Sequence, residues 1–515
     1  MKEEYTYEEL LTLQNIDKFE SARVLELLAH IFETGRENKD VNVIKNGLRL
    51  AKSRSLVDFS DNNKAIFHFF VANGWAYLHQ LTHTINRNEF WAFETPEIEN
   101  EIVNLRKAIS ISEKIDNPGL LTQVLSEVNT NLGNTFNQVG RIVEAIHYWN
   151  KAIELKPGFG MAIGNLGFGL AHYVRILFDD GHRSVFCQYA YKYLKQGAVS
   201  KDVYADGQQA FQNMADILEE NYGKEKLEIE QDLKNFSLGR SDSERDYRQW
   251  CIDNSLFINP LNDFIYENIV AHDCLFLPNI TLKKDEPPFF HSLYNQIKQE
   301  FVSARYLYYQ SLTNQKPHFS DKDNMQMDTL DYAVYSLSTE KLKAAFRICY
   351  SIFDKIGYLV NSYFKIGLDP KDVSFRKVWK KRAAGSKDWE LHPVITESQN
   401  WPLRGLYWLS KDLYENDSEF FRSILPEAQQ LASIRNFIEH KSFKIVDIGE
   451  TAIVDNGLTY QIRRHEFEQK VGILMSMARA AILNLSFAVH LEEIKKDKQS
   501  AFPMPFFKLD DKFKR

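Results

Sequence analysis

The segment SEVNTNLGNTFNQVGRIVEAIHYWNKAIELKP, residues 126–157, decides the fold of the first half of the chain. Its apolar residues recur every three or four positions on both sides of Gly140, which predicts two helices joined by a tight turn. Gly133 is one of the small residues that let the two helices approach closely, and large residues such as Trp149 fill the gaps between them. Pro157 follows the second helix and ends it. The segment therefore predicts a closely packed helix pair.

The order and spacing of these residues are those of a tetratricopeptide unit, which is roughly 34 residues long. Weaker copies flank the segment at 166–171, 74–108 and 22–51, and the second of these carries a long insertion at 86–97. One such unit cannot bury its apolar face alone, so stacked neighbours are needed. We therefore predict a helical solenoid over residues 1–235, whose groove binds a protein or peptide partner. The eight matching positions are Leu132, Gly133, Phe136, Gly140, Ala145, Trp149, Ala152 and Pro157.

The second half of the chain follows a different pattern. Residues 236–285 are interpreted as an ordered connector, because they hold many large apolar residues around a helix-breaking Asn259-Pro260 pair. Residues 286–500 show helical apolar spacing over long stretches, which predicts a four-helix bundle, and residues 501–515 form a basic tail. The four helical stretches are 289–312, 339–364, 402–440 with a break near Asn416-Asp417, and 465–495.

A small β-hairpin is expected between the third and fourth helices of the bundle. Residues 443–448 and 458–463 alternate between apolar and polar, and they flank Asp455-Asn456-Gly457, which is typical of a tight hairpin turn. The predicted fold class is therefore all-α, with a tetratricopeptide-like helical solenoid followed by a four-helix bundle that carries a β-hairpin insertion.

The composition limits the classes of function. Acidic residues exceed basic ones, 70 against 63, so a protein that coats nucleic acid is disfavoured and any nucleic-acid contact must come from a local site. The four cysteines are far apart, which favours reduced thiols over disulfides or a zinc site. The N-terminus shows no signal core, and no run approaches the roughly 18 apolar residues of a membrane span. We expect a cytoplasmic protein without membrane contact, metal or cofactor.

The residues with the clearest chemistry lie at the end of the third bundle helix, in the sequence IRNFIEHK, residues 434–441. An imidazole exchanges protons near neutral pH, which suits His440 for acid–base catalysis. The guanidinium of Arg435 can hold a phosphate with two hydrogen bonds and offset charge that develops on it. Asn436 can orient either group, and Lys441 adds positive charge.

In this helical context the motif resembles that of the HEPN superfamily, which consists of an arginine, a polar residue, three further residues and a histidine. Arg435, Asn436 and His440 occupy these positions, and the likeness extends over residues 288–495 in the order of the helices. Three further stretches look like a subgroup in which the domain is fused to helical repeats. They are 247–263, 328–332 and 401–408.

The resemblance implies a ribonuclease that needs no metal and works as a homodimer or higher homo-oligomer, with the motifs of the bundles facing each other. RNA is then the substrate, its 2′-OH is the nucleophile, and the products are a 2′,3′-cyclic phosphate and a 5′-OH end. Arg435, Asn436 and His440 are the catalytic residues in this interpretation. It further implies a toxin or an antiviral-defence effector that is regulated through the repeat domain.

Two features keep other interpretations open. Residues five apart on an ideal α-helix point about 140° away from each other, so Arg435 and His440 share a face only if the helix tightens or ends near His440, or if two copies combine. A structural interpretation pairs Arg435 with Glu439 as an ordinary i,i+4 ion pair and lets His440 cap the helix. The protein is then a non-catalytic scaffold that dimerises through the bundle and binds partners on its repeats. A bundle that binds nucleotides without cutting RNA is a third possibility.

A second RNA contact is predicted between the second and third bundle helices, in the sequence FRKVWKKR, residues 375–382. Cations neutralise phosphates, and aromatic rings stack on exposed bases. A solvated loop is the alternative of equal weight. The residues assigned to RNA binding are Lys441, Arg376, Lys377, Trp379, Lys380, Lys381 and Arg382.

Overall fold

The chain folds into two compact units in a computed structural model. We call the first the repeat unit (Met1–His172, Phe186–Ile229 and Lys411–Gln429) and the second the bundle unit (Tyr173–Val185, Glu230–Ser410 and Gln430–Arg515). The residues that the structure describes are 6–83, 92–115, 118–282, 287–328, 330, 332–382, 385, 389–413, 423–447, 454–455, 457–496 and 509–514.

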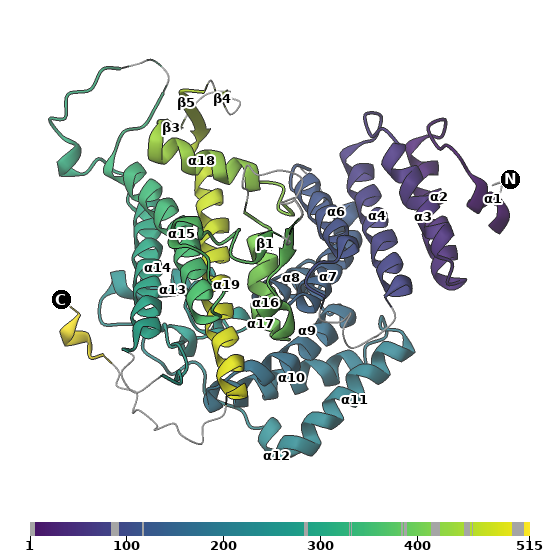
Figure 1. Ribbon diagram of the computed structural model, residues 1–515, viewed down its shortest axis with the longest axis horizontal. Coiled ribbons are helices and arrows are strands. Elements are labelled where there is room, and N and C mark those ends of the chain that lie inside the picture. Colours follow the sequence, from purple (N-terminus) through teal and green to yellow (C-terminus); the bar gives the residue numbers. More distant parts are fainter. Residues whose placement is uncertain are drawn as a thin grey trace. The chain divides into compact units, whose positions relative to one another are not determined.

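The repeat unit consists of helices that pack on their neighbours along the chain (Figure 1). α2 packs on α3 and α4, α4 packs along α6, and α7 packs along α8. The expected helical repeats and all-α class are therefore confirmed, whereas the tetratricopeptide type stays a prediction. The helices are α1 (Tyr7–Thr12), α2 (Ser21–Glu37), α3 (Val41–Ser53), α4 (Asp61–Thr82), α6 (Pro96–Ser112), η1 (Pro118–Leu121), α7 (Thr122–Gln138), α8 (Ile142–Leu155), α9 (Gly160–Tyr173), α10 (Asp180–Ala198), α11 (Ala205–Tyr222) and α12 (Lys224–Leu227).

The helix pair α7 and α8 shows the predicted close approach. A Cβ atom added at Gly133 would lie 2.6 Å from the ring of Trp149, so only glycine fits beneath that indole. The indole is 1% exposed and donates a hydrogen bond from Nε1 to the side chain of Asn134 at 2.9 Å. Gly140 lies between the helices at a φ of 88°, a left-handed conformation that glycine adopts without strain.

A buried cluster of charges lies inside the repeat unit. Asp412 accepts hydrogen bonds from Arg106 at 2.5 and 2.9 Å and from Arg141 at 2.6 Å. Both guanidinium groups also lie over the ring of Phe136, with their carbon atoms 5.1 and 4.4 Å from its centroid. The segment Lys411–Gln429 is thereby held within the repeat unit, although the residues on either side of it belong to the bundle unit.

The bundle unit has α14, α15 and α19 side by side, with α17 packed on α19 (Figure 1). The third helical stretch of the sequence is divided into α17 and α18. The predicted break at Asn416-Asp417 lies outside the described residues, as does most of the basic tail. The elements are η2 (Val174–Ile176), α13 (Asp242–Asp253), η3 (Pro260–Asp263), η4 (Asn268–Val270), α14 (Phe289–Thr313), η5 (Phe319–Asp321), α15 (Leu337–Tyr363), η6 (Pro370–Asp372), β1 (Lys380–Arg382), β2 (Trp389–Leu391), α16 (Pro393–Glu397), α17 (Trp401–Ser410), α18 (Ala428–His440), β3 (Ser442–Val446), β4 (Val454–Asp455), β5 (Thr459–Arg463), α19 (Arg464–Lys495) and η8 (Asp511–Phe513).

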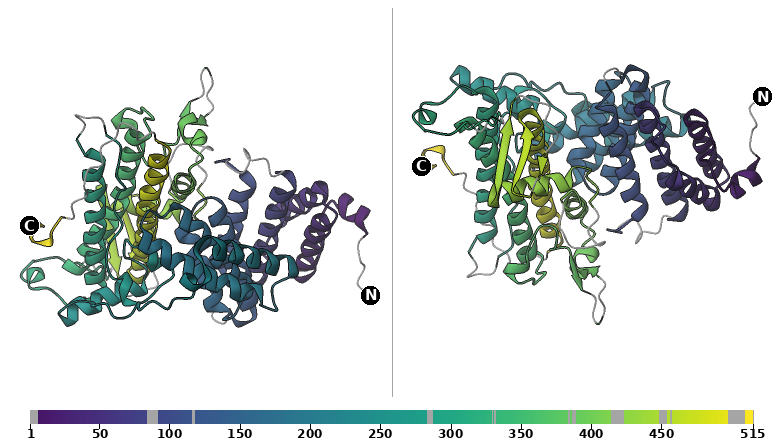
Figure 2. Two further views of the ribbon diagram at one scale, coloured as in Figure 1. Left: turned by 90° about the horizontal axis from the view of Figure 1, so that it is seen from below. Right: turned by 90° about the horizontal axis from the view of Figure 1, so that it is seen from above.

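The small sheet differs from the predicted hairpin. The antiparallel pair is formed by β4 and β5, with Asp455 opposite Tyr460. β3 pairs with β5 in parallel, with Ser442 opposite Thr459. The sheet order is therefore β3-β5-β4, and its strands pack against α19 (Figure 2). The expected hairpin insertion is present, but its arms are β4 and β5; residues 443–448 are not its first arm, because β3 pairs with β5 in parallel.

Two buried arginines tie the connector to the bundle. Arg479 of α19 donates to the carbonyl oxygen of Phe257 at 2.6 Å and pairs with the carboxylate of Asp263 at 2.5 Å. Arg305 of α14 pairs with Asp273 at 2.8 Å. Both arginines are 2% exposed, so these contacts take the place of most of their water and fix the connector on the helices.

α19 is long and apolar enough to pass for a membrane span. However, 83% of its most apolar window is buried inside the structure. Its length and composition are therefore explained by its position as the central helix of the bundle unit, and its neighbours supply the apolar surroundings that a bilayer would otherwise provide.

Candidate active site

α18 positions the motif because its apolar residues are spaced three apart. Leu431, Ile434 and Phe437 are 1%, 0% and 3% exposed and form its buried face. The ring of Phe437 lies 5.5 Å from the ring of Tyr460 on β5. This buried stripe turns the motif residues toward solvent, and Arg435 is one of them.

Arg435 does not follow the i,i+4 pairing that the sequence allowed. Its guanidinium reaches α15, where Nη2 lies 3.4 Å from Oδ2 of Asp354. The guanidinium carbon also lies 4.7 Å from the centroid of the Tyr350 ring, a cation–π contact. Two residues one turn apart on α15 therefore hold Arg435. No pattern in the sequence indicated these two residues, because 81 positions separate Asp354 from Arg435.

The contact between Arg435 and Asp354 is weak by its geometry. The two side chains are 47% and 36% exposed, and 3.4 Å is long for a charge-assisted hydrogen bond. Burial raises the pKa of Asp354, and the nearby Arg435 opposes that rise without cancelling it. The carboxylate therefore holds the guanidinium in place. It neutralises the positive charge less fully than a short bidentate pair would.

Asn436 and His440 lie on the exposed side of α18. Within the described residues, no hydrogen bond or ion pair occupies either side chain. His440 is the last residue of the helix, and the helix is α-helical up to that residue. The helix therefore ends at His440 without tightening, and the angular separation of about 140° between Arg435 and His440 applies within one chain.

Lys441 follows the helix and is engaged locally. Its Nζ donates to the carbonyl oxygen of Gly457 at 2.8 Å and lies 4.7 Å from the centroid of the Phe437 ring. These contacts connect the end of α18 to the loop before β5. The ammonium group remains exposed beside His440, so its charge is still available to an anion.

The predicted second RNA contact divides into buried and surface residues. Trp379 is 0% exposed and donates from Nε1 to the carbonyl oxygen of Phe375 at 2.6 Å, so it cannot stack on a base, and that prediction is wrong. Arg376 and Lys380 are also buried, at 4% and 5% exposed, which argues against phosphate binding by either. The alternation of cations and aromatics reflects a segment that buries one side.

Three cations of that stretch remain at the surface. Lys377 is half-buried, Lys381 pairs with Glu390 at 3.2 Å, and Arg382 lies over the ring of Trp389 at 4.9 Å. Their assignment to RNA binding stays a prediction. Lys387, which follows in the sequence, lies outside the described residues.

Comparison with known protein families matches residues 281–492 to the family described as LA2681-like HEPN. The matched region contains α14, α15, α17, α18 and α19, and with them Arg435, Asn436 and His440. Neither the curated proteins nor the solved structures that were compared with the chain gave a match. The matched region is less than half of the 515 residues, and it is this part of the chain that is similar to the HEPN-type domain.

Proposed function

We propose that the bundle unit is a metal-independent endoribonuclease whose catalytic residues are Arg435, Asn436 and His440. The supporting observation is that the HEPN-like region has a guanidinium, an amide and an imidazole exposed near one helix end. Among the described residues, none makes a hydrogen bond or an ion pair with that imidazole. These groups serve proton transfer and the stabilisation of a charged phosphate, which are the two tasks in RNA cleavage.

The reaction transfers a phosphoryl group from the 5′-oxygen to the 2′-oxygen within the RNA. The 2′-oxygen bonds to the adjacent phosphorus, the bond from phosphorus to the 5′-oxygen breaks, and one proton moves from the 2′-OH to the departing 5′-oxygen. His440 takes or delivers that proton, and Arg435 stabilises the negative charge on the non-bridging oxygens. The products are a 2′,3′-cyclic phosphate and a 5′-OH.

Two copies of the chain complete the site in this proposal. Arg435 and His440 diverge on one helix, so a phosphate held by the arginine of one copy is approached more directly by the histidine of another. Two histidines then divide the work of base and acid. The oligomer is a homodimer or a higher homo-oligomer formed through the bundle.

A cleavage assay in the presence of a metal chelator tests the proposal. Wild-type protein, His440→Ala and Arg435→Ala are incubated with total RNA, and the new ends are mapped. We expect His440→Ala to lower the rate by about 10²–10⁴-fold, because a positioned acid–base group contributes that much. His465→Ala is the matched control, since His465 is an exposed histidine of α19 outside the motif. Equal rates for all four proteins would contradict the proposal.

The biological role in this proposal is that of a toxin or antiviral-defence effector acting in the cytoplasm, with its activity controlled by a protein or peptide bound to the repeat unit. The same four proteins test this role by growth after induction. Wild-type and His465→Ala should slow growth, and the two motif variants should not. Equal growth of wild-type and His440→Ala under every trigger would remove the effector role while leaving the chemistry open to the cleavage assay.

The contact of Arg435 with Asp354 and Tyr350 favours a second candidate. If that contact is only structural, the protein is a non-catalytic scaffold that dimerises through the bundle and binds partners on its repeats. In that case RNA stays intact with every variant, whereas Arg435→Ala weakens the fold or the dimer. Sedimentation of wild-type and Arg435→Ala proteins distinguishes the two candidates.

A further inference from the structure

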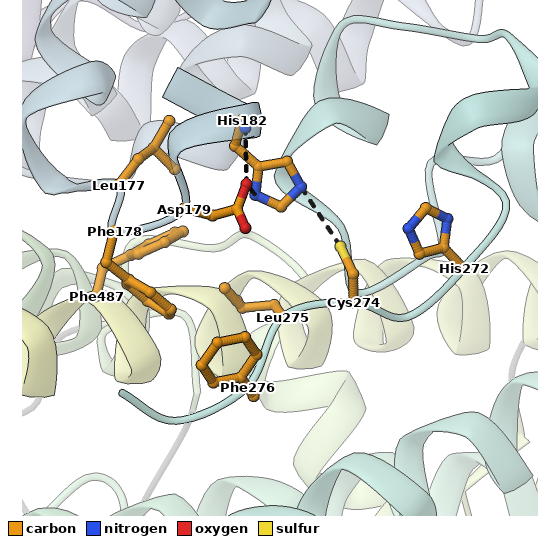
Figure 3. A pocket seen from close by; sticks show the side chains of 9 residues that line it. All are labelled: Leu177, Phe178, Asp179, His182, His272, Cys274, Leu275, Phe276 and Phe487. Carbon is orange, nitrogen blue, oxygen red and sulfur yellow. Dashed lines mark hydrogen bonds and ion pairs between the residues drawn. The ribbon is translucent and has the colours of Figure 1, made fainter. Parts of the chain in front are cut away.

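A cavity of about 180 Å³ lies in the bundle unit, away from the motif (Figure 3). Its walls differ in character, because aliphatic and aromatic side chains cover one side and a thiol, two imidazoles and a carboxylate gather on the other. The apolar residues are Leu177, Phe178, Leu275, Phe276 and Phe487, and the polar residues are Asp179, His182, His272 and Cys274.

The beginning of α10 fixes the carboxylate and one imidazole. Asp179 precedes the helix, and its Oδ1 accepts a hydrogen bond from the backbone N–H of His182 at 2.8 Å, as an N-cap residue does. The same Oδ1 lies 3.7 Å from Nδ1 of His182. At this distance the contact is electrostatic and is not a hydrogen bond, but the nearby carboxylate favours the tautomer with the proton on Nδ1, in which Nε2 is the acceptor.

Cys274 meets that lone pair. Its Sγ lies 3.5 Å from Nε2 of His182, a hydrogen bond between residues 92 positions apart in the sequence (Figure 3). The thiol is partly exposed, whereas Cys187, Cys251 and Cys349 are buried. A carboxylate, an imidazole and a thiol thus lie next to one another, and all three residues line the cavity.

Burial determines the charge of this pair. It raises the pKa of the Cys274 thiol to about 12, although the Lys298 ammonium opposes the rise. It also lowers the pKa of His182, where Asp179 acts to raise it and His272 to lower it further. The resting pair is therefore a neutral thiol that donates to a neutral imidazole.

Other charged groups near the thiol come from its own loop and from α14. The carboxylate of Asp273 acts to raise the pKa of Cys274. Lys298 of α14 donates from Nζ to the carbonyl oxygens of Asp273 and Leu275, both at 2.6 Å, so its ammonium group is fixed beside the thiol. A general base is consequently needed for Cys274 to react at neutral pH, and His182 is in position to be that base.

We propose that this cavity is a covalent binding site for small, uncharged α,β-unsaturated carbonyl compounds, with Cys274 as nucleophile and His182 as its base. The thiol proton passes to Nε2 of His182 while Sγ bonds to the β-carbon. The electron pair of the carbon–carbon double bond moves to the carbonyl as an enolate. The imidazolium then returns the proton to the α-carbon, so the addition balances without a leaving group or an oxidant.

The walls select the ligand. The apolar side offers no partner for a charge, and the charged groups near the thiol, Asp179 and Lys298, are already held by backbone groups of the protein. Because burying an unpaired charge is costly, the compound is uncharged. The single polar side holds the only groups that the addition requires. This site is independent of the motif on α18, and its test does not involve RNA.

The experiment measures the rate of adduct formation at Cys274 in the native full-length protein. Acrylamide is the probe, and peptide mass spectrometry reports each cysteine separately, normalised to the rate of a free cysteine derivative. We expect Cys274 to react at least tenfold faster than the three buried cysteines. A sulfonated acrylamide, which has the same reactive group and a negative charge, should react at least tenfold more slowly than acrylamide at this site.

The pH dependence separates a base-assisted thiol from a merely exposed one, and it needs only wild-type protein. With His182 as base, the rate levels off once that imidazole has lost its proton, so it stays nearly constant between pH 7 and 9. An unassisted thiol with a pKa near 12 reacts about tenfold faster for each pH unit over the same range. A steady rise of that kind would overturn the proposal.

Variants give the second readout. His182→Gln removes the base and should slow labelling by more than tenfold, while His465→Gln, which changes an exposed histidine outside the cavity, should change it by less than twofold. Asp179→Asn keeps a good N-cap but removes the charge that raises the pKa of His182, so the plateau should begin at lower pH. Equal labelling of wild-type protein and a folded His182→Gln variant would contradict the assignment of the base.

Discussion

Two aspartate–arginine contacts show how differently one chemical pairing is used in this chain. In the repeat unit, Asp412 and its partners Arg106 and Arg141 are 1%, 8% and 1% exposed, and their contacts are 2.5–2.9 Å long. In the bundle unit, Asp354 and Arg435 are 36% and 47% exposed and lie 3.4 Å apart. The first contact is closed to water and the second is open to it.

The difference indicates what each pair can do. A buried carboxylate that has lost its water depends on its partners, so removing one leaves an uncompensated charge. An exposed pair is worth little to stability because water solvates both members when they separate. Arg435 can therefore leave Asp354 for a phosphate at low cost, whereas Arg106 and Arg141 are committed to the fold.

The largest expected effect is on the buried pair. Asp412→Asn should lower the free energy of unfolding of the repeat unit by about 3–5 kcal/mol, because the buried Arg106 loses its counter-charge and Arg141 keeps only Glu144, 2.7 Å away. Denaturant unfolding followed by circular dichroism measures it. Asp58→Asn is the matched control in the same unit, since Asp58 pairs with Arg54 at 2.6 Å but is 52% exposed, and it should cost less than about 1 kcal/mol.

The same pair should produce an acid transition. Burial disfavours the charge on Asp412, but Arg106 and Arg141 outweigh it and lower its pKa to about 2. A carboxyl group with a depressed pKa in the folded state contributes stability above its unfolded value, near ~4, and loses that contribution as the pH falls toward 2. Asp412→Asn should abolish this part of the pH dependence. An unchanged acid profile would show that the cluster does not hold the repeat unit together.

A second buried carboxyl group has no cation beside it among the residues that the structure describes. Glu101 is 9% exposed and accepts a hydrogen bond from the hydroxyl of Thr135 at 2.7 Å. Burial raises its pKa to about 7, with the Thr135 hydroxyl acting in the opposite direction. The folded state thus holds the proton more tightly than the unfolded state does. Its contribution to stability is complete below about pH 4 and is lost as the pH rises to 7.

Glu101→Gln should remove that loss, because the amide is neutral at every pH and still accepts from Thr135. The variant should be more stable than wild-type protein at pH 8, by an amount on the order of 3 kcal/mol, with the difference shrinking toward pH 4. Thermal unfolding of both proteins across pH 4–8 measures it. A variant that is less stable at pH 8 would mean that the carboxylate has a partner in solution that burial alone does not predict.

Local patterns in the sequence were sufficient for much of the fold. The close approach of α7 and α8 could be predicted because the small and large residues that allow it lie within one helix pair, and the bundle helices could be predicted from their own apolar spacing. Contacts between distant segments could not be predicted from such local patterns. The parallel pairing of β3 with β5 was missed because an alternating strand shows that it pairs but does not show with which partner or in which direction.

The candidate site shows the same limit. The positions of Arg435, Asn436 and His440 on an exposed helix end followed from the spacing of Leu431, Ile434 and Phe437, but the reach of Arg435 to α15 did not. Trp379 was misassigned for a related reason. A short segment of alternating cations and aromatics looks the same whether its rings face solvent or the core, and only the packing around it decides.

The smallest expected effect is the one that decides how Arg435 is used. Asp354→Asn removes the carboxylate but leaves the ring of Tyr350, so the free energy of unfolding should fall by less than about 1 kcal/mol. If Arg435 binds the phosphate of RNA, losing a competing negative charge should lower the KM for RNA severalfold and leave kcat unchanged, because binding is affected and the proton transfer at His440 is not. Glu300→Gln is the matched control, since Glu300 pairs with Lys355 of α15 at 2.8 Å and should leave KM unchanged. The alternative result is that Asp354→Asn and Arg435→Ala lower the free energy of unfolding equally and change RNA cleavage in the same way. The pair then acts as one structural contact, which differs from the buried cluster only in its strength.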